Sequence, residues 1–255
     1  MDVTEVQHVT VSAPSRIPCG LFSTSNDDGP SFGGMGVMLR SPRTEISITP
    51  SSQFEVSRGS AIVNDQVFAE LRSTITTIVD RWLQRYGSIV DIRDRQLDDF
   101  PVRVTVNSIP DRHYGFGSGT QIALSVAAAL FGCAGQPLAA PEEIAPVVER
   151  GRRSAIGTYG FFTGGLLIDQ GKVPGQSLAP LDFQIAFPEE WPIFIAYERT
   201  RRVVSGLKEK AAFERLEPTP DHEREHSISI VRDRIVPAIT SRDYDRFAAG
   251  LYEFG

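Results

Sequence analysis

IPDRHYGFGSGTQ, from Ile109 to Gln121, is the stretch that decides how this chain is interpreted. It follows an alternating apolar pattern, opens a helix, and places Gly115, Gly117 and Gly119 around Ser118. A glycine-rich loop at a helix start exposes backbone N–H groups that have no partner inside the helix, so it suits a phosphate or another anion. We therefore predict that the N–H groups of Gly117–Thr120 and the Ser118 hydroxyl contact a phosphate.

Two common phosphate loops are excluded by the residues around Gly119. A Walker A loop needs a lysine after its last glycine, but Thr120 follows Gly119 here. The dinucleotide fingerprint spaces its glycines as Gly-x-Gly-x-x-Gly, whereas this loop reads Gly-x-Gly-x-Gly from Gly115. We therefore expect another class of anion site, with a plain tight connection between strand and helix as the alternative.

The segments beside the loop predict a rigid support for it. Residues Val102 to Asn107 alternate between valine and polar side chains, which indicates a half-buried strand. Ser118 to Phe131 is apolar nearly all round, which predicts a buried helix whose N-terminus is firmly aimed. Asn64 to Tyr86 carries apolar residues at helical spacing and predicts a long amphipathic helix.

The remaining patterns give a mixed order of helices and strands, which favours an α+β class over a doubly wound parallel sheet. Glu45–Thr49 and Gln53–Ser57 predict a hairpin across Pro50. Two further strands and two C-terminal helices are expected at Phe161–Asp169, Trp191–Tyr197, His226–Thr240 and Ser241–Phe254.

Composition bounds the class of protein. The 255 residues carry a net charge of −6, which argues against a nucleic-acid partner because such partners need a basic face. No apolar run approaches the ~20 residues of a membrane span, and the first residues lack the layout of a signal peptide. Cys19 and Cys133 do not suggest a disulfide framework. We expect a cytoplasmic protein with no membrane partner.

Arginine dominates the basic residues. Lys172, Lys208 and Lys210 are the three lysines among 26 basic residues. Arginine suits bidentate contacts with phosphate and carboxylate, although GC-rich coding would produce the same excess. Arg152 and Arg153 are therefore candidate anion ligands, with the capping of helix carbonyls as the alternative.

These motifs resemble those of the GHMP kinase superfamily. The loop from Pro110 to Thr120 looks like its second motif, and Ala13-Pro14-Ser15-Arg16-Ile17 looks like its first. Phe32–Val37, His113 and Gly151–Gly157 narrow the resemblance to the β-ribofuranosylaminobenzene 5′-phosphate synthase family, which makes a precursor of tetrahydromethanopterin.

The resemblance implies a two-lobe fold. Residues 1–173 would form a lobe like the second domain of ribosomal protein S5, with the phosphate loop. Residues 174–255 would form part of a ferredoxin-like α/β lobe, which we expect to be incomplete in this chain. A homodimer is compatible with an unfinished sheet edge.

The resemblance also implies a reaction. The family condenses phosphoribosyl pyrophosphate with 4-aminobenzoate, or the closely similar 4-hydroxybenzoate, and releases carbon dioxide and pyrophosphate. Such chemistry needs donors for the leaving pyrophosphate and Mg²⁺, which Ser118 is expected to contact, but no organic cofactor. No residue is assigned as a catalytic base or nucleophile. Binding roles fall to the following residues: Arg16, His113, Gly115, Gly117, Ser118, Gly119, Thr120, Arg152, Arg153, Ser154 and Lys208.

Structural roles remain the alternative for several of these residues: a salt bridge for Arg16, a satisfied loop residue for His113, and a surface position for Lys208. Gly157 stands where kinases of the superfamily carry an aspartate base, which argues against an ordinary kinase. Pro18 stands where the synthase family has a histidine. Two other functions stay open: an ATP-dependent small-molecule kinase and a non-catalytic ligand-binding paralogue.

Overall fold

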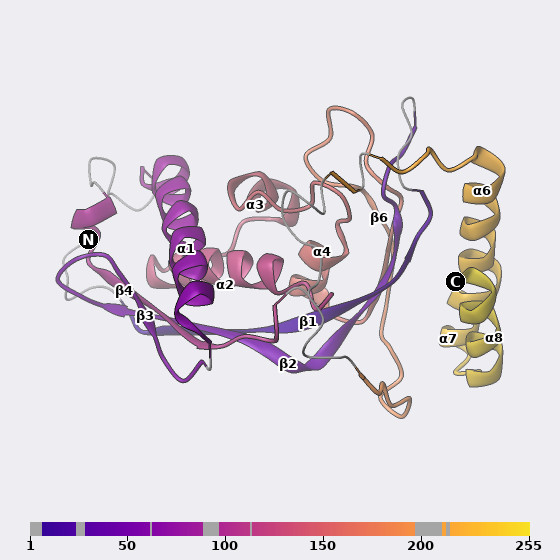
Figure 1. The fold of residues 1–255 in the computed structure, drawn as a ribbon, viewed down its shortest axis with the longest axis horizontal. Helices are drawn as coiled ribbons and strands as arrows, with labels where there is room; N and C mark the ends of the chain where they lie inside the picture. The colour runs from indigo at the N-terminus through magenta and orange to yellow at the C-terminus, as the bar shows by residue number, and fades with distance from the viewer. Residues whose placement is uncertain are drawn as a thin grey trace. The chain divides into compact units, whose positions relative to one another are not determined.

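The computed structural model describes residues 7–23, 29–61, 63–88, 97–112, 114–196, 211–212 and 215–255 (Figure 1). The chain divides into two compact units. The first contains Met1–Ser15, Arg40–Arg112 and Gly117–Arg150; the second contains Arg16–Leu39, His113–Phe116 and Gly151–Gly255. Strands β1 (Val9–Leu21) and β2 (Gly34–Pro50) each contribute residues to both units.

The sheet of the first unit has β4 (Val102–Ser108) at its centre. This strand pairs antiparallel with the second half of β2 and parallel with β3 (Glu55–Arg58). The predicted hairpin is therefore wrong, because β4 lies between β2 and β3. The valines of β4 explain this: Val102, Val104 and Val106 are fully buried, so their strand occupies the interior of the sheet.

Two helices complete the first unit's core, and both confirm the sequence prediction. Helix α1 (Asp65–Tyr86) begins at Asn64, whose side chain accepts a hydrogen bond from the Val67 N–H at 2.9 Å. The fully buried Trp82 packs edge-to-face on Phe131 of α2 (Ser118–Cys133), with ring centroids 5.6 Å apart. The unit also contains a short helical turn η2 (Leu97–Asp99) and α3 (Pro141–Val147).

In the second unit, the first half of β2 pairs with β5 (Leu166–Asp169), and β5 pairs with β6 (Leu181–Ile185), both antiparallel. Two sequence predictions are corrected here. Residues 161–163 lie in α4 (Ile156–Thr163) rather than in a strand. Residues 191–196 form no strand, and the outer strand is β6.

Helices cover both faces of the second unit's sheet (Figure 1). Gly36 of β2 faces Ile156 of α4, since a Cβ built on Gly36 would lie 3.1 Å from that side chain. The neighbouring Met35 points to the other face and packs in a core with Ile235 and Phe247. That core joins the sheet to the C-terminal helices, α6 (Asp221–Ile230), the π-helical turn η3 (Val231–Ile235), α7 (Val236–Thr240) and α8 (Tyr244–Phe254).

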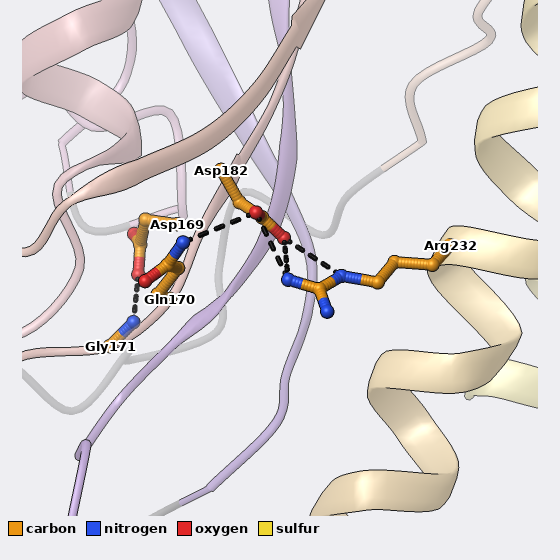
Figure 2. Close-up of polar contacts among 5 residues, drawn as sticks. All are labelled: Asp169, Gln170, Gly171, Asp182 and Arg232. Atoms are coloured by element: carbon orange, nitrogen blue, oxygen red, sulfur yellow. Dashed lines mark hydrogen bonds and ion pairs between the residues drawn. The ribbon is translucent and has the colours of Figure 1, made fainter.

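An ion pair also joins β6 to these helices. Asp182 accepts hydrogen bonds from Nε and Nη2 of Arg232 on η3, at 2.9 to 3.2 Å, and another from Gln170 at 3.2 Å (Figure 2). The Arg232 side chain is about half exposed, so the pair contributes modestly to stability. Among the described residues, no helix is long and apolar enough to cross a membrane.

Candidate functional site

The predicted phosphate loop forms the N-terminus of α2 in the structure. Gly117 is the N-cap residue and has a left-handed backbone with φ of 68°, which favours glycine. The carbonyl of Gly117 accepts from the N–H groups of Thr120 and Gln121 at 3.0 and 3.1 Å. Within the described part of the chain, no hydrogen bond engages the N–H of Ser118 or Gly119, or the Ser118 hydroxyl. These three donors are therefore left for a ligand.

Helix α2 is buried, which fixes the position of its N-terminus, and the helix dipole places a partial positive charge there. Most residues of the helix are buried, as its sequence predicts, and Leu124, Val126 and Ala127 are fully buried. The first turn contains no acidic residue. The partial positive charge of the helix N-terminus is consequently not balanced by a carboxylate within that turn.

Arg150 adds a full positive charge beside this helix end. A Cβ built on Gly119 would lie 3.6 Å from Nη2 and 3.8 Å from Cζ of Arg150. The sequence interpretation named Arg152 and Arg153 as candidate anion ligands and did not name Arg150. The cluster of three arginines between 150 and 153 was visible, but nothing in it shows which side chain turns toward α2.

In the second unit, the first motif meets the residues that precede α2. The Arg16 N–H donates to the Phe116 carbonyl at 2.9 Å. Gly115 is exposed and has a φ of 87°, and a Cβ built on it would lie 4.0 Å from Cδ of Pro18. Pro18 therefore lies beside the glycine segment.

The segment Gly151–Ser154 is held by a carboxylate that the sequence interpretation did not assign. Ser154 Oγ donates to Oδ2 of Asp169 at 3.0 Å, and the Ala155 N–H donates to the same oxygen at 2.8 Å. The Gly171 N–H donates to Oδ1 at 3.0 Å (Figure 2). Asp169 therefore fixes the backbone that enters α4, and the Ser154 hydroxyl proton is already engaged within the protein.

Asp169 has no exposure to solvent, and this burial sets its electrostatics. Desolvation raises the pKa of the Asp169 carboxyl, and the hydrogen bonds from Ala155, Gly171 and Ser154 offset part of that rise. Gly157 follows in the first turn of α4 and is buried. This position, which the sequence analysis compared with a kinase base, therefore offers no titratable side chain.

The predicted site residues fall into three groups. The first unit brings Gly117–Thr120 and Arg150 together. The second unit brings the Arg16 backbone together with the segment that contains Gly115, and it also contains Arg152, Arg153 and Ser154. His113 and Lys208 lie outside the described residues. The binding roles assigned to all of them stay predictions.

The structure offers little that could hold a metal by itself. In the described ranges, no three His, Cys, Asp or Glu side chains gather as a metal site. The Ser118 hydroxyl fits a supporting ligand, because it makes no hydrogen bond to another described residue. Mg²⁺ usually retains waters and is held largely by substrate phosphates, so the residues present are compatible with a metal that enters with its substrate.

Comparison of the sequence with curated proteins finds similarity to beta-ribofuranosylphenol 5′-phosphate synthases. The chain is 29% identical over 260 residues to the beta-ribofuranosylphenol 5′-phosphate synthase of Methanothermobacter thermautotrophicus, which covers 97% of this chain and 75% of that protein. The enzyme of the same name from Archaeoglobus fulgidus is 27% identical over 250 residues, covering 93% and 72%. No family model matches the chain.

Comparison with solved structures identifies the fold. Phosphomevalonate kinase from Streptococcus pneumoniae superposes with a TM-score of 0.64 at 10% identity, covering 97% of this chain and 77% of the other. Mevalonate diphosphate decarboxylase from Legionella pneumophila gives 0.56 at 11% identity, covering 97% and 76%. The chain is therefore a sequence relative of the beta-ribofuranosylphenol 5′-phosphate synthases, built on the two-lobe fold of the GHMP kinases.

Proposed function

We propose that this protein is a phosphoribosyl-transferring synthase. It joins C1′ of phosphoribosyl pyrophosphate to the ring carbon of 4-hydroxybenzoate or 4-aminobenzoate that carries the carboxylate. Carbon dioxide and pyrophosphate are released, and the product is an aryl C-riboside 5′-phosphate on the route to tetrahydromethanopterin. Sequence similarity to named synthases over nearly the whole chain is the observation that carries this proposal.

The proposed reaction balances without a protein base. Pyrophosphate leaves C1′ with its bonding electron pair, and the ring carbon supplies the pair for the new C–C bond. The carboxylate then departs as carbon dioxide and returns its C–C electron pair to the ring, which restores aromaticity. A missing base at Gly157 is compatible with this chemistry, whereas it removes the usual aspartate from a kinase mechanism.

The protein's main task is then to bind two anions and stabilise the charge that develops on pyrophosphate. The N–H groups of Ser118 and Gly119 and the Ser118 hydroxyl are suited to a phosphate oxygen. Arg152 and Arg153 are proposed to bind the 5′-phosphate, the pyrophosphate or the benzoate carboxylate. Arg16, His113 and Lys208 are proposed as further contacts.

Mg²⁺ is proposed to enter with the pyrophosphate, with Ser118 as a supporting ligand. When bound, the ion would neutralise part of the charge on the leaving group. No organic cofactor is proposed. We propose that the protein works in the cytoplasm, where its substrates are small molecules.

The test is the release of labelled carbon dioxide. The protein is incubated with Mg²⁺, phosphoribosyl pyrophosphate and 4-hydroxybenzoate or 4-aminobenzoate labelled in the carboxyl carbon, and a parallel sample receives ATP in place of the ribosyl donor. Labelled carbon dioxide that requires the ribosyl donor supports the proposal and ranks the two acceptors. ADP formed from ATP with a small alcohol would instead revive a kinase, and binding of the donor without turnover would indicate a non-catalytic paralogue.

A further inference from the structure

We propose that Arg150 is a phosphate-binding residue, which acts with the N-terminus of α2 as one pyrophosphate subsite. The ligand class is an inorganic pyrophosphate or a phosphate ester. That this anion belongs to a ribosyl donor rests on the proposed function, whereas the subsite itself rests on the geometry of the first unit.

The position of Arg150 is fixed by its neighbours. Its N–H donates to the Ala145 carbonyl of α3 at 2.9 Å. Glu149 has a positive φ of 52° and forms an ion pair of 2.5 Å with Arg81 of α1. The backbone from which the Arg150 side chain departs is thus anchored to both α3 and α1. A guanidinium anchored in this way loses less entropy when it binds a ligand.

The guanidinium lies where an anion would meet it. Its Nη2 atom is 3.6 Å from a Cβ built on Gly119, the second residue of α2. Two positive features therefore converge: a full charge on Arg150 and the partial charge of a helix N-terminus without an acidic residue in its first turn.

Ser118 supplies an independent observation at the same point. The residue is only 7% exposed, yet its hydroxyl makes no hydrogen bond to another described residue. Because Cα–Cβ bonds in a helix tilt toward its N-terminus, the Ser118 side chain leaves the backbone toward the end at which these N–H groups lie. A buried hydroxyl without a protein partner is usually satisfied by water or a ligand.

The chemistry of the donors selects a phosphate-class anion. Two backbone N–H groups, one hydroxyl and a planar guanidinium lie at the same end of α2. Guanidinium groups pair with two oxygens of a phosphate at once, and pyrophosphate offers more oxygens and more charge than inorganic phosphate. We therefore expect pyrophosphate to bind more tightly than phosphate.

The first test measures pyrophosphate binding to the whole chain by calorimetry at fixed salt. Arg150→Gln should weaken binding by about ten- to a hundredfold, the loss expected for hydrogen bonds to a charged group. The affinity of Arg150→Lys for pyrophosphate should lie between those of the wild type and Arg150→Gln, because lysine retains the charge but not the planar guanidinium. Arg103→Gln is the matched control, since it also removes one positive charge but comes from an exposed ion pair with Glu55 on β3 and β4.

The second test does not remove any arginine. Gly119→Asp places a carboxylate beside Arg150 and in the first helical turn, where acidic residues stabilise the helix. It should raise the melting temperature and abolish pyrophosphate binding. Gly119→Asn has the same shape without the charge, and it should retain more binding than Gly119→Asp.

Wild-type protein that does not bind pyrophosphate, or equal affinities in the wild type and Arg150→Gln, would overturn the inference. Equal binding by Gly119→Asp and Gly119→Asn would also overturn it. The outcomes also distinguish failure of the pyrophosphate subsite from failure of the proposed synthase function. Wild-type release of carbon dioxide with unchanged pyrophosphate affinity in Arg150→Gln would refute the subsite alone. Reduced affinity in Arg150→Gln with no carbon dioxide from the wild type would support the subsite and refute the synthase.

Discussion

The Ser154 hydroxyl donates a 3.0 Å hydrogen bond to Oδ2 of Asp169, a carboxylate with no exposure to solvent. The Ala155 N–H shares that acceptor, and the Gly171 N–H uses the other carboxylate oxygen. One buried side chain therefore joins the end of β5 to the segment that leads into α4. The arginines at 152 and 153 immediately precede that attachment.

Asp169→Ala should lower the free energy of unfolding by about 2–3 kcal/mol, because buried donors lose their acceptor. Urea titration of the purified protein measures this change. Asp182→Ala is the control, since it removes a carboxylate whose partner Arg232 is about half exposed, and it should cost less than about 1 kcal/mol. Equal costs for the two variants would contradict the role given to Asp169.

The dependence of stability on pH should also report Asp169. Burial raises the pKa of this carboxyl in the folded protein, so folding favours the protonated form. Its contribution to stability is present below the unfolded value of about 3.9 and is lost as the pH rises through the folded pKa. The stability of the wild type relative to Asp169→Asn should therefore fall as the pH rises above about 4. A difference that grows over this range would show that the folded pKa is lowered instead.

The two glycines at the start of α2 should respond oppositely to alanine. Gly117 has a φ of 68°, and a left-handed alanine costs about 1–2 kcal/mol. A Cβ on Gly119 meets only ordinary contacts with Arg150, and alanine favours a helix by up to about 1 kcal/mol. Thermal unfolding of both variants checks this. Equal destabilisation would mean that the loop does not adopt this backbone.

Neither cysteine should react readily in the folded protein. Burial raises the pKa of Cys19 to about 11 and that of Cys133 to about 12. Compared with an ordinary thiol of pKa about 8.5, alkylation by iodoacetamide at pH 8 should be slowed roughly 100-fold or more. Mass spectrometry before and after denaturation gives the comparison. Rapid labelling of Cys19 in the native state would contradict the raised pKa of this half-buried thiol.

The sequence predicted elements whose signals are local. Asn64 caps a helix whose apolar stripe ends at Tyr86, and both features lie within one segment. The apolar run after Ser118 likewise predicts a buried helix without knowledge of its neighbours. The α+β class followed from the order of such elements, whereas the GHMP fold was implied by the resemblance of the sequence motifs to that superfamily.

Strand pairing was predicted less well because it depends on residues distant in the sequence. Proximity suggested a hairpin between β2 and β3, but the fully buried valines of β4 occupy the place between them. Trp191 and its apolar neighbours resembled a strand, yet the Trp191 ring packs on Phe247 at 5.1 Å and residues 191–196 form no strand. The strand is β6, where fewer apolar residues gave a weaker signal.

The candidate site was predicted only in part, because some of its geometry also depends on features that are not local in the sequence. The glycine pattern identified the N-terminus of α2, since phosphate loops have a recognisable local composition. Which arginine faces that end depends on backbone turns at Glu149 and Gly151, whose φ angles are 52° and 72°. Sequence spacing does not determine those turns, so Arg150 was overlooked in favour of the two arginines that follow it.

The stoichiometry of one reaction mixture tests the central claim most directly. The protein, Mg²⁺ and phosphoribosyl pyrophosphate are combined with carboxyl-labelled 4-hydroxybenzoate, and in a parallel sample with carboxyl-labelled 4-aminobenzoate. Labelled carbon dioxide and pyrophosphate are measured together. A C-riboside synthase predicts one carbon dioxide for each pyrophosphate, with neither formed when either substrate is omitted. Pyrophosphate released without carbon dioxide from either benzoate, or no release of either product, would contradict the assignment.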